Sequence, residues 1–421
     1  MADQFSTARQ RRTVLAGSIG NVLEFYDFAV YGYLAAAIGR HFFPGESPTA
    51  QLLAVFGVFA VGYIARPLGG VLIGHLGDLY GRRTALTVSV VAMAVPTVLI
   101  GLLPGYATIG IAAPILLVLL RMLQGLSVGG EFTSSIVFLV ERAPAHRRGF
   151  IGSFATVGSV GGILLGSSVA AILTACVSEE AFYDWAWRLP FLAGITIGIA
   201  GFVLRRELQD EEPTVREGRA PIVETLQDHW RLVLQLAGIA VFNGIAFHIC
   251  FIYVASWLQT ADGIPPARAL EINSASLAAL LVVMVLAARL SDRIGRKPVM
   301  MAALFCALVT ALPLFELMHH ESALLAFLGQ LGFVVSVGSY IGVLPSLMTE
   351  MVPARIRCTA MSVAFNLCIG IAGGTAPFVA AWLVATTGEA VSPAYYIMLA
   401  AAVALSALVT VGETHRVPLP A

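Results

Sequence analysis

The sequence predicts an all-α integral membrane protein with twelve transmembrane helices in two six-helix halves, and three observations support this fold class. Of the 421 residues, 58% are hydrophobic and only 12% are charged, whereas a soluble domain has roughly 25% charged residues. Apolar runs of about 20 residues, the length of a membrane-spanning helix, recur along the whole chain. Two short loop motifs also occur twice, once in each half.

The apolar runs define the expected helices. The first half has runs at 14–38, 50–75, 84–104, 111–139, 150–176 and 187–205. The second half has runs at 230–257, 267–290, 298–319, 322–349, 356–386 and 391–412. The longest polar interval, 206–229, is the predicted cytoplasmic linker, so the two halves are 1–205 and 230–421.

Basic residues set the expected orientation, because short cytoplasmic loops retain Lys and Arg. With the N-terminus inside, nearly all loop arginines fall on the cytoplasmic side, and only Arg40, Arg188 and Arg268 fall outside. Both termini are therefore predicted to be cytoplasmic. The first run carries charges in its middle and is longer than a signal-peptide core, so we expect a retained helix in a multi-pass cell-membrane protein.

Enzyme chemistry is not indicated by any motif. The five cysteines and eight histidines lack metal-ligand or redox spacing, and there is no phosphate-binding glycine loop or serine nucleophile elbow. The formal net charge of zero gives no reason to expect nucleic acid as a partner. We expect neither a metal nor a cofactor, and the partners to be the lipid bilayer and a small molecule.

The loop motifs repeat with matching spacing. "GDLYGRR" at 77–83 matches "SDRIGRK" at 291–297, and "ERAPAHRRG" after the fourth run matches "EMVPARIRC" after the tenth. A glycine permits a tight reversal, and an aspartate at a helix boundary can accept from exposed backbone donors. Any cytoplasmic loop is enriched in arginine, but the matching motif spacing in four loops favours gating contacts at the cytoplasmic ends of the helices. The candidate gating residues are Asp78, Arg82, Glu141, Arg148, Asp292, Arg296, Glu350 and Arg357.

The first run carries two carboxylates inside "GNVLEFYDFAVYGY". Glu24 and Asp27 share one helix face, which Asn21 and Tyr31 extend by a turn each way. Asp27 is expected about 20 Å from the inner end of the helix, near the bilayer midplane. A charge there costs about 2.5 to 3.5 kcal/mol by insertion scales, so these acids should face a cavity or charged partners.

Candidate partners lie on the second and fourth helices. Arg66 belongs to the second helix, Arg121 and Gln124 lie on one face of the fourth, and Glu131 follows nearer the cytoplasm. Three acids beside two arginines leave one surplus negative charge, which a single proton can cancel. The proton-coupling candidates are Asp27, Glu24 and Glu131. A static ion pair holding the first and fourth helices together is the alternative.

With these loops and helices, the chain resembles the major facilitator superfamily, whose halves rock about a central substrate site. "HFFP", "ARPLGGVLIGHLGD", "RMLQGLSVGGEFTSS" and "DWAWRLPF", with the first-helix stretch, resemble its metabolite:proton symporter family. That family includes transporters of citrate, 2-oxoglutarate, shikimate, and proline or betaine. "VPARIRCTAMSVAFN", "PAYYIML" and the pair "ET" are most similar to the proline/betaine branch. In related sugar:proton symporters an Asp in helix one pairs with an Arg in helix four, which corresponds here to Asp27 and Arg121.

The resemblance implies a proton symporter that works as a monomer. Protonation of Asp27 would free Arg121 for a substrate carboxylate, so proton and solute would be imported together. Two substrate classes stay open: a zwitterion such as proline or betaine, which is favoured, and a di- or tricarboxylate. A proton-driven exporter fits less well, because the fifth helix lacks the Gly-Pro antiporter signature. The C-terminal half offers Asn243, His248, Tyr340 and Asn366 as further substrate-binding candidates.

Overall fold

The computed structural model describes residues 21–22, 24–45, 47–80, 82–128, 131–206 and 221–420. Every regular element in these residues is a helix. In the first half the helices are α2 Ala35–Phe42, α3 Pro48–Ile64, α4 Arg66–Tyr80, α5 Arg82–Leu102, α6 Tyr106–Ile109, α7 Ala112–Ser127, α8 Glu131–Glu141, α9 Arg148–Cys176, α10 Glu179–Asp184 and α11 Leu189–Arg206. Residues 24–33 form the helix that carries the two acids.

The second half begins beyond the short helix α12 Pro221–Asp228, which lies in the predicted linker. Its helices are α13 Trp230–His248, α14 Val254–Ala261, α15 Pro266–Ile294, α16 Arg296–Met318, α17 Ala323–Met351, α18 Arg357–Leu367, α19 Gly374–Thr387 and α20 Pro393–Val409. Two π-helical segments, Ile249–Tyr253 and Cys368–Gly373, join α13 to α14 and α18 to α19.

Eight helical spans of the described residues are long and apolar enough to cross a membrane. They are Pro48–Gly70, Ala112–Glu141, Ala145–Cys176, Trp230–Ala261, Pro266–Ile294, Arg296–Met318, Ala323–Met351 and Arg357–Thr387. Two shorter apolar helices, Thr87–Leu102 and Pro393–Val409, coincide with the third and twelfth predicted runs. The prediction of an all-helical, multi-pass membrane protein is confirmed; the count of twelve and the cytoplasmic termini stay predictions.

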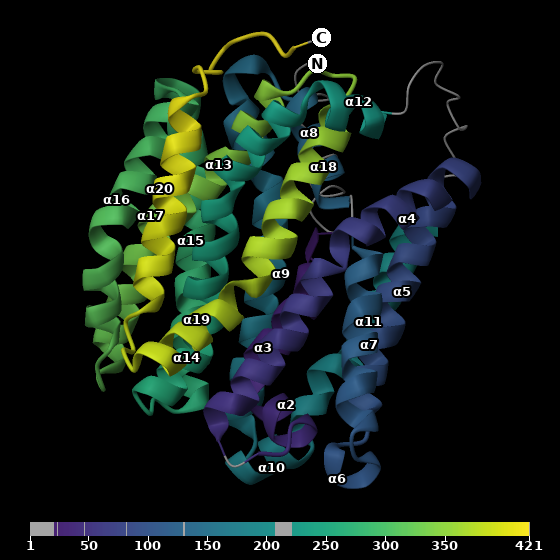
Figure 1. Cartoon of the computed structure of the whole chain (residues 1–421), viewed down its shortest axis with the longest axis vertical. Coiled ribbons are helices and arrows are strands. Elements are labelled where there is room, and N and C mark those ends of the chain that lie inside the picture. The colour runs from purple at the N-terminus through teal and green to yellow at the C-terminus, as the bar shows by residue number, and fades with distance from the viewer. Residues whose placement is uncertain are drawn as a thin grey trace, which may run out of the picture.

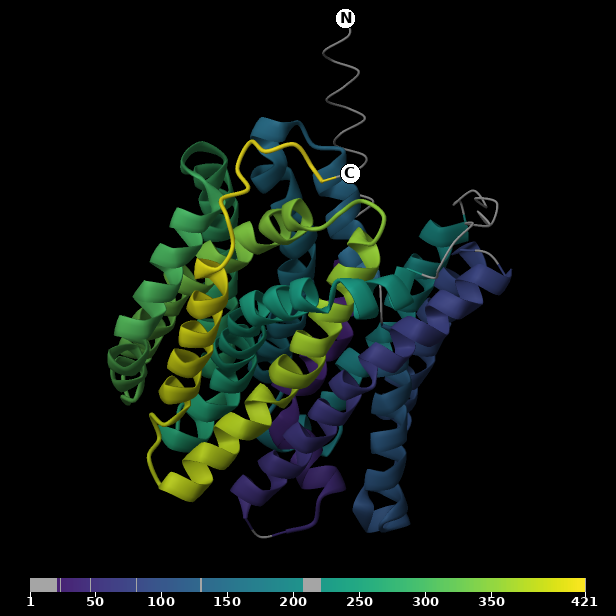
Figure 2. The same cartoon turned by 45° about the horizontal axis from the view of Figure 1, so that its top comes forward.

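The two halves pack against each other mainly where α9 contacts α15 and α17 and where α3 contacts α19. Figure 1 shows α4, α5, α7 and α11 of the first half on one side and α16, α17 and α20 of the second half on the other. Figure 2 shows the segment after α20 crossing one end of the molecule toward the start of α18, where the amide of Ala354 donates to the carbonyl of Pro420. This end contains the loops predicted to be cytoplasmic.

Glycine allows close helix contacts within the first half. A Cβ atom at Gly125 would lie 1.9 Å from the carbonyl oxygen of Gly62, and one at Gly162 would lie 2.2 Å from that of Val22. Both distances are shorter than any real contact, so only glycine fits. The first contact holds α7 against α3, and the second holds α9 against Val22, which precedes Glu24 in the chain, as expected for small-residue packing.

Candidate functional site

The acid nearer the predicted cytoplasmic side, Glu24, pairs with Arg66 of α4. Their Oε1 and Nη2 atoms are 3.2 Å apart, and both side chains are almost fully buried. The guanidinium of Arg66 also lies 5.2 Å from the ring centre of Tyr63 and 5.5 Å from that of Phe28. Arg66 is therefore held by a carboxylate and by aromatic faces, which stabilise a buried cation.

Asp27 and Arg121 are both buried, at 2% and 0% exposure, but they are not in direct contact as an ion pair. The hydroxyl of Thr97 on α5 lies 3.1 Å from Oδ2 of Asp27, and Nε2 of Gln124 donates to that hydroxyl at 2.7 Å. Oε1 of Gln124 accepts from Nη1 of Arg121 at 2.8 Å. Two uncharged side chains thus bridge the acid and the arginine that the sequence analysis expected to find side by side.

The direction in which Asp27 points explains this difference. Its carboxylate turns toward α5 and α11, where a Cβ at Gly194 would lie 3.6 Å from Oδ1. Oδ1 has no hydrogen-bond partner among the described residues. Asp27 is therefore enclosed between helices of the first half, and among the described residues it is connected to Arg121 through the hydrogen bonds of Gln124 and Thr97.

The guanidinium of Arg121 keeps one edge unpaired. Nε and Nη2, which form that edge, are buried without a hydrogen-bond partner in the described part of the chain. Aromatic rings surround the group, with centres 4.3 Å away for Tyr31, 4.8 Å for Phe28 and 5.7 Å for Phe59. Unsatisfied buried donors are costly, and this edge has the fork geometry that binds a carboxylate through two bonds.

His248 links the two halves near this aromatic cluster. Its Nε2 lies 3.2 Å from the hydroxyl of Tyr63 on α3, and its Nδ1 lies 2.7 Å from the carbonyl of Gly244. A Cβ at Gly373, in the second π-helical segment, would lie 3.2 Å from the ring. Of the candidates in the C-terminal half, His248 is the one that lies next to the aromatic rings surrounding Arg66 and Arg121.

The other predicted binding residues have separate environments. Asn21 donates to Ser135 and to the carbonyl of Ala155, so it joins α8 to α9. Tyr340 donates to the carbonyl of Ile239, and Asn366 donates to Ser362 on the same helix. Asn243 lies half-buried on α13. The side chain of Glu131 lies outside the described residues.

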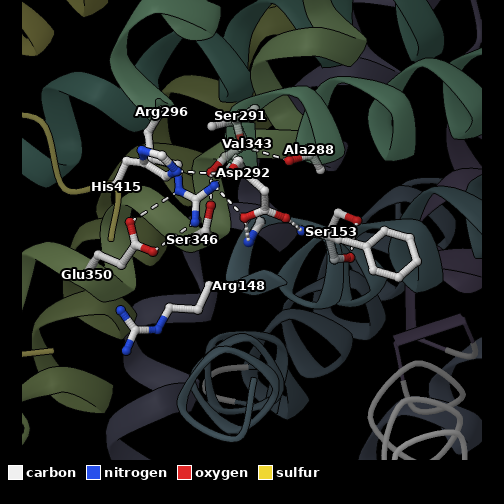
Figure 3. A network of polar contacts seen from close by, with 12 residues as sticks. Arg148, Ser153, Ala288, Ser291, Asp292, Arg296, Val343, Ser346, Glu350 and His415 are labelled. Atoms are coloured by element: carbon white, nitrogen blue, oxygen red, sulfur yellow. Dashed lines mark hydrogen bonds and ion pairs between the residues drawn. The ribbon is translucent and has the colours of Figure 1, made fainter. Parts of the chain in front are cut away.

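The gating loop of the second half forms a buried charge network (Figure 3). Arg296 contacts Asp292 at 2.7 Å and Glu350 at 3.0 Å. The two carboxylate oxygens of Asp292 accept from the amides of Gly149 and Phe150 at 2.9 and 2.8 Å. These amides open α9 in the first half, so Asp292 caps a helix of the opposite half, as a side-chain oxygen at an N-cap does.

Two other arginines that were predicted to be gating residues also connect segments at this end of the molecule. Arg357 forms an ion pair with Glu141, and thereby links α18 to α8. Nη1 of Arg148 donates to the carbonyl of Val417 at 2.8 Å. The side chains of Asp78 and Arg82 lie outside the described residues, so the first-half copy of the motif stays a prediction.

Glu413 completes this network from the C-terminal segment. Its carboxylate accepts from the amides of Arg296 and Lys297 at the start of α16, at 2.9 and 3.0 Å. Burial alone would raise the pKa of Glu413, but the backbone donors outweigh it, so the pKa lies below its usual value. The neighbouring Thr414 donates to Glu350 at 2.6 Å.

Thr97, Tyr63 and a polar cluster between the halves were not predicted from the sequence. In that cluster Asn273 donates to Ser167 of α9 at 3.2 Å, and Gln330 donates to Asn273 at 2.8 Å. Gln330 also donates to the carbonyl of Cys250 in the first π-helical segment. Asn and Gln inside apolar runs were a usable signal, whereas Ser, Thr and Tyr are too common in membrane helices to be one.

Comparison with known proteins agrees with this architecture. The model of the Major Facilitator Superfamily matches residues 17–377 and, in a second match, residues 272–419. The chain belongs to the major facilitator superfamily. Members of this superfamily are transporters, so the chain is a membrane transporter and not an enzyme.

Curated relatives of this major facilitator chain cover nearly all of it. The proline/betaine transporters of Salmonella typhimurium and Escherichia coli are each 37% identical to it over 97% of this chain and 85% of theirs. The glycine betaine/proline/ectoine/pipecolic acid transporter of Dickeya dadantii is 36% identical over 98% of this chain and 85% of its own.

Solved structures agree with the fold. A proton:xylose symporter bound to 6-bromo-6-deoxy-D-glucose superposes with a TM-score of 0.77 over 98% of both chains at 18% identity. An inward-open conformation of the xylose transporter from Escherichia coli gives 0.74 over 97% of this chain and 98% of that one, also at 18% identity. At this identity the likeness establishes the major facilitator fold alone.

Proposed function

We propose that the chain imports a small zwitterionic solute that bears a carboxylate, of the proline or betaine type, together with a proton. The observation that carries the proposal is the unpaired, buried edge of Arg121, connected through Gln124 and Thr97 to the buried carboxylate of Asp27. The names of the curated relatives support the solute class. The transporter works as a monomer by alternating access, with protons as its coupling ion and without a cofactor.

Charge balance favours a zwitterion over a di- or tricarboxylate. Arg66 is already neutralised by Glu24, so Arg121 is the cation among the described residues of this site that is left for a substrate anion. One carboxylate can bind its free edge through two charge-assisted bonds. The rings of Tyr31, Phe59 and Tyr63, which already contact the two arginines, offer faces for a substituted ammonium group.

Coupling follows from the shared hydrogen-bond chain. While Asp27 is ionised, the hydrogen bonds that start at Arg121 all point toward its carboxylate, which balances the positive charge of Arg121. Once Asp27 is protonated, this row of hydrogen bonds holds no negative charge to balance Arg121. A substrate carboxylate then supplies that counter-charge, so proton and solute binding favour each other. Membrane potential contributes about 2.3 kcal/mol per charge per 100 mV to inward proton movement, which makes uptake the expected direction.

Binding to purified variants tests the substrate site. Loss of a charge-assisted contact costs about 1.5 to 3 kcal/mol, or roughly 10- to 150-fold in affinity for glycine betaine. We expect no measurable binding by Arg121→Ala, weak binding by Arg121→Lys, which keeps the charge but loses the fork, and a milder loss for Arg66→Lys. Arg268→Ala is the control, because Arg268 is exposed and pairs only with Glu271 among the described residues. Calorimetry that found near-normal binding by Arg121→Ala would place the carboxylate elsewhere.

Transport by proteoliposomes tests the coupling. Asp27→Asn should abolish accumulation driven by a proton gradient but retain exchange of labelled glycine betaine between equal concentrations. Full accumulation by this variant would exclude Asp27 as the coupling group. Citrate that displaced glycine betaine from the wild type with equal affinity would favour the tricarboxylate alternative.

A further inference from the structure

Thr97 lies at the centre of the chain that connects Asp27 to Arg121. It is 1% exposed, and its hydroxyl is within hydrogen-bond distance of three groups: the carbonyl of Met93 at 2.8 Å, Oδ2 of Asp27 at 3.1 Å and Nε2 of Gln124 at 2.7 Å. A hydroxyl carries a single hydrogen and two acceptor lone pairs. It therefore donates to Met93 or to Asp27, but not fully to both at once.

Chemistry fixes the direction of the neighbouring bonds. An arginine only donates, so the oxygen of the Gln124 amide must face Nη1 of Arg121, and its nitrogen must face Thr97. Thr97 therefore accepts from Gln124 whatever the protonation state of Asp27.

We propose that Thr97 is a positioning residue that transmits the protonation state of Asp27 to Arg121 by turning its hydroxyl hydrogen. This inference rests on the proposed proton coupling. With Asp27 ionised, Thr97 donates to the carboxylate, and all three bonds from Arg121 point toward the negative charge. Such an aligned chain polarises its members and strengthens each bond.

Protonation reverses the last bond of the chain. A proton binds the carboxylate at Oδ2, and the new O–H donates to the second lone pair of Thr97, while the hydroxyl hydrogen of Thr97 turns to the carbonyl of Met93. The three hydrogen bonds between Arg121, Gln124, Thr97 and Asp27 are all kept, but they no longer point toward a negative charge. Arg121 is then held less firmly by Gln124, and its guanidinium becomes available to a substrate carboxylate.

The other described neighbours of Asp27 do not take over the hydrogen bond that Thr97 makes to its carboxylate. Arg121 of α7 is the charged group that interacts with Asp27, and Tyr26 on the same helix is a titratable neighbour. Tyr26 already donates to the carbonyl of Pro190. From α11 the neighbour is Gly194, which has no titratable side chain. Thr97 of α5 is thus the hydrogen-bond donor to Asp27 among the described residues.

The test removes the hydroxyl while keeping the shape of the side chain. In Thr97→Val, ionised Asp27 loses a bond to a charged group, whereas protonated Asp27 loses only a neutral one, and the charged bond is worth more. The pH at which glycine betaine binding is half-maximal should therefore rise by roughly one unit. Gradient-driven accumulation should fall at least tenfold, while exchange at equal concentrations persists.

Two variants serve as controls. Thr97→Ser keeps the hydroxyl and should restore both the pH dependence and the accumulation. Thr310→Val on α16 removes a comparable hydroxyl, which donates to the carbonyl of Cys306 four residues earlier, and should leave both readouts at wild-type values. If Thr97→Val does not fold, Gln124→Met breaks the chain on the other side of Thr97 and should likewise separate accumulation from exchange.

The outcomes distinguish this inference from the proposed function. Wild-type binding that does not depend on pH would overturn proton coupling itself, and the role of Thr97 with it. A pH-dependent wild type together with an unshifted, fully accumulating Thr97→Val would overturn the role of Thr97 alone. Failure of Thr97→Ser to restore the pH dependence would likewise show that packing, and not the hydroxyl, matters at this position.

Discussion

Replacing Asp292 with Asn should weaken the contact between the two halves at the predicted cytoplasmic end. Asp292 lies in the last turn of α15, and its carboxylate accepts from the amides of Gly149 and Phe150, which open α9 in the other half. Its third partner, Arg296, lies in the same half and also pairs with Glu350. The contribution of Asp292 between the halves therefore comes from the two amide bonds.

The magnitude follows from the difference between charged and neutral hydrogen bonds. A bond to a carboxylate contributes about 1.5 to 3 kcal/mol and a neutral one about 0.5 to 1.5 kcal/mol. Asn can keep one amide bond in neutral form and loses the other, and it also loses the attraction of a negative charge to a helix N-terminus. Two charged bonds replaced by one neutral bond give a net loss of about 1.5 to 5.5 kcal/mol, which lowers the ratio of closed to open states at this end by roughly 10- to 10,000-fold.

Labelling of a single cysteine measures this ratio. Ser346 is fully buried on α17, and a Cβ at Gly152 of α9 would lie 3.9 Å from its Cβ, so it reports on the interface between the halves. Ser346→Cys in a background without the five native cysteines should react faster with a membrane-impermeant maleimide once Asp292→Asn is added. The increase should match the expected ratio, provided that the reagent reaches the predicted cytoplasmic side.

Asp184→Asn is the matched control, because Asp184 is exposed at the end of α10 and should not change the labelling rate. An Asp292→Asn variant that labelled at the rate of its parent would refute the idea that this carboxylate holds the halves together. The remaining contacts, such as the pair of Arg357 with Glu141, would then be the ones that close this end.

Two other substitutions test the packing and the C-terminal cap. Gly125→Ala should push α7 away from α3, because its Cβ would lie 1.9 Å from the carbonyl oxygen of Gly62. We expect a lower melting temperature and loss of betaine binding. Gly161→Ala, whose Cβ would meet nothing within 4 Å, should change neither. Glu413 is exposed, and its backbone donors lower its pKa, so its ionised form stabilises the fold above its unfolded pKa of about 4.3. This stability is lost as the pH falls through the lower folded value. Glu413→Gln should therefore lower the melting temperature at pH 7 and leave it unchanged once the pH is below the folded value; an equal effect at both pH values would contradict the cap.

The sequence alone predicted the features that depend on local chain properties. Apolar run length placed the helices to within a few residues, as for the run 267–290 and the span Pro266–Ile294, because a helix crosses the bilayer with its own backbone bonds satisfied. Helical periodicity put Glu24 and Asp27 on one face. The repeated loops singled out Asp292, Arg296 and Glu350, which the structure brings together.

Only the tertiary structure decided which partner each buried charge takes. Arg121 was available to Asp27 in the sequence, but the carboxylate points to Thr97, 70 positions away along the chain. Asp292 was expected to accept from exposed backbone donors, and the structure shows that these donors are amides of α9 in the other half. Nearly every residue offers a backbone donor, and Ser and Thr are common in membrane helices, so residue type and spacing do not distinguish among these partners. The choice depends on where rigid helices from distant parts of the chain come into contact.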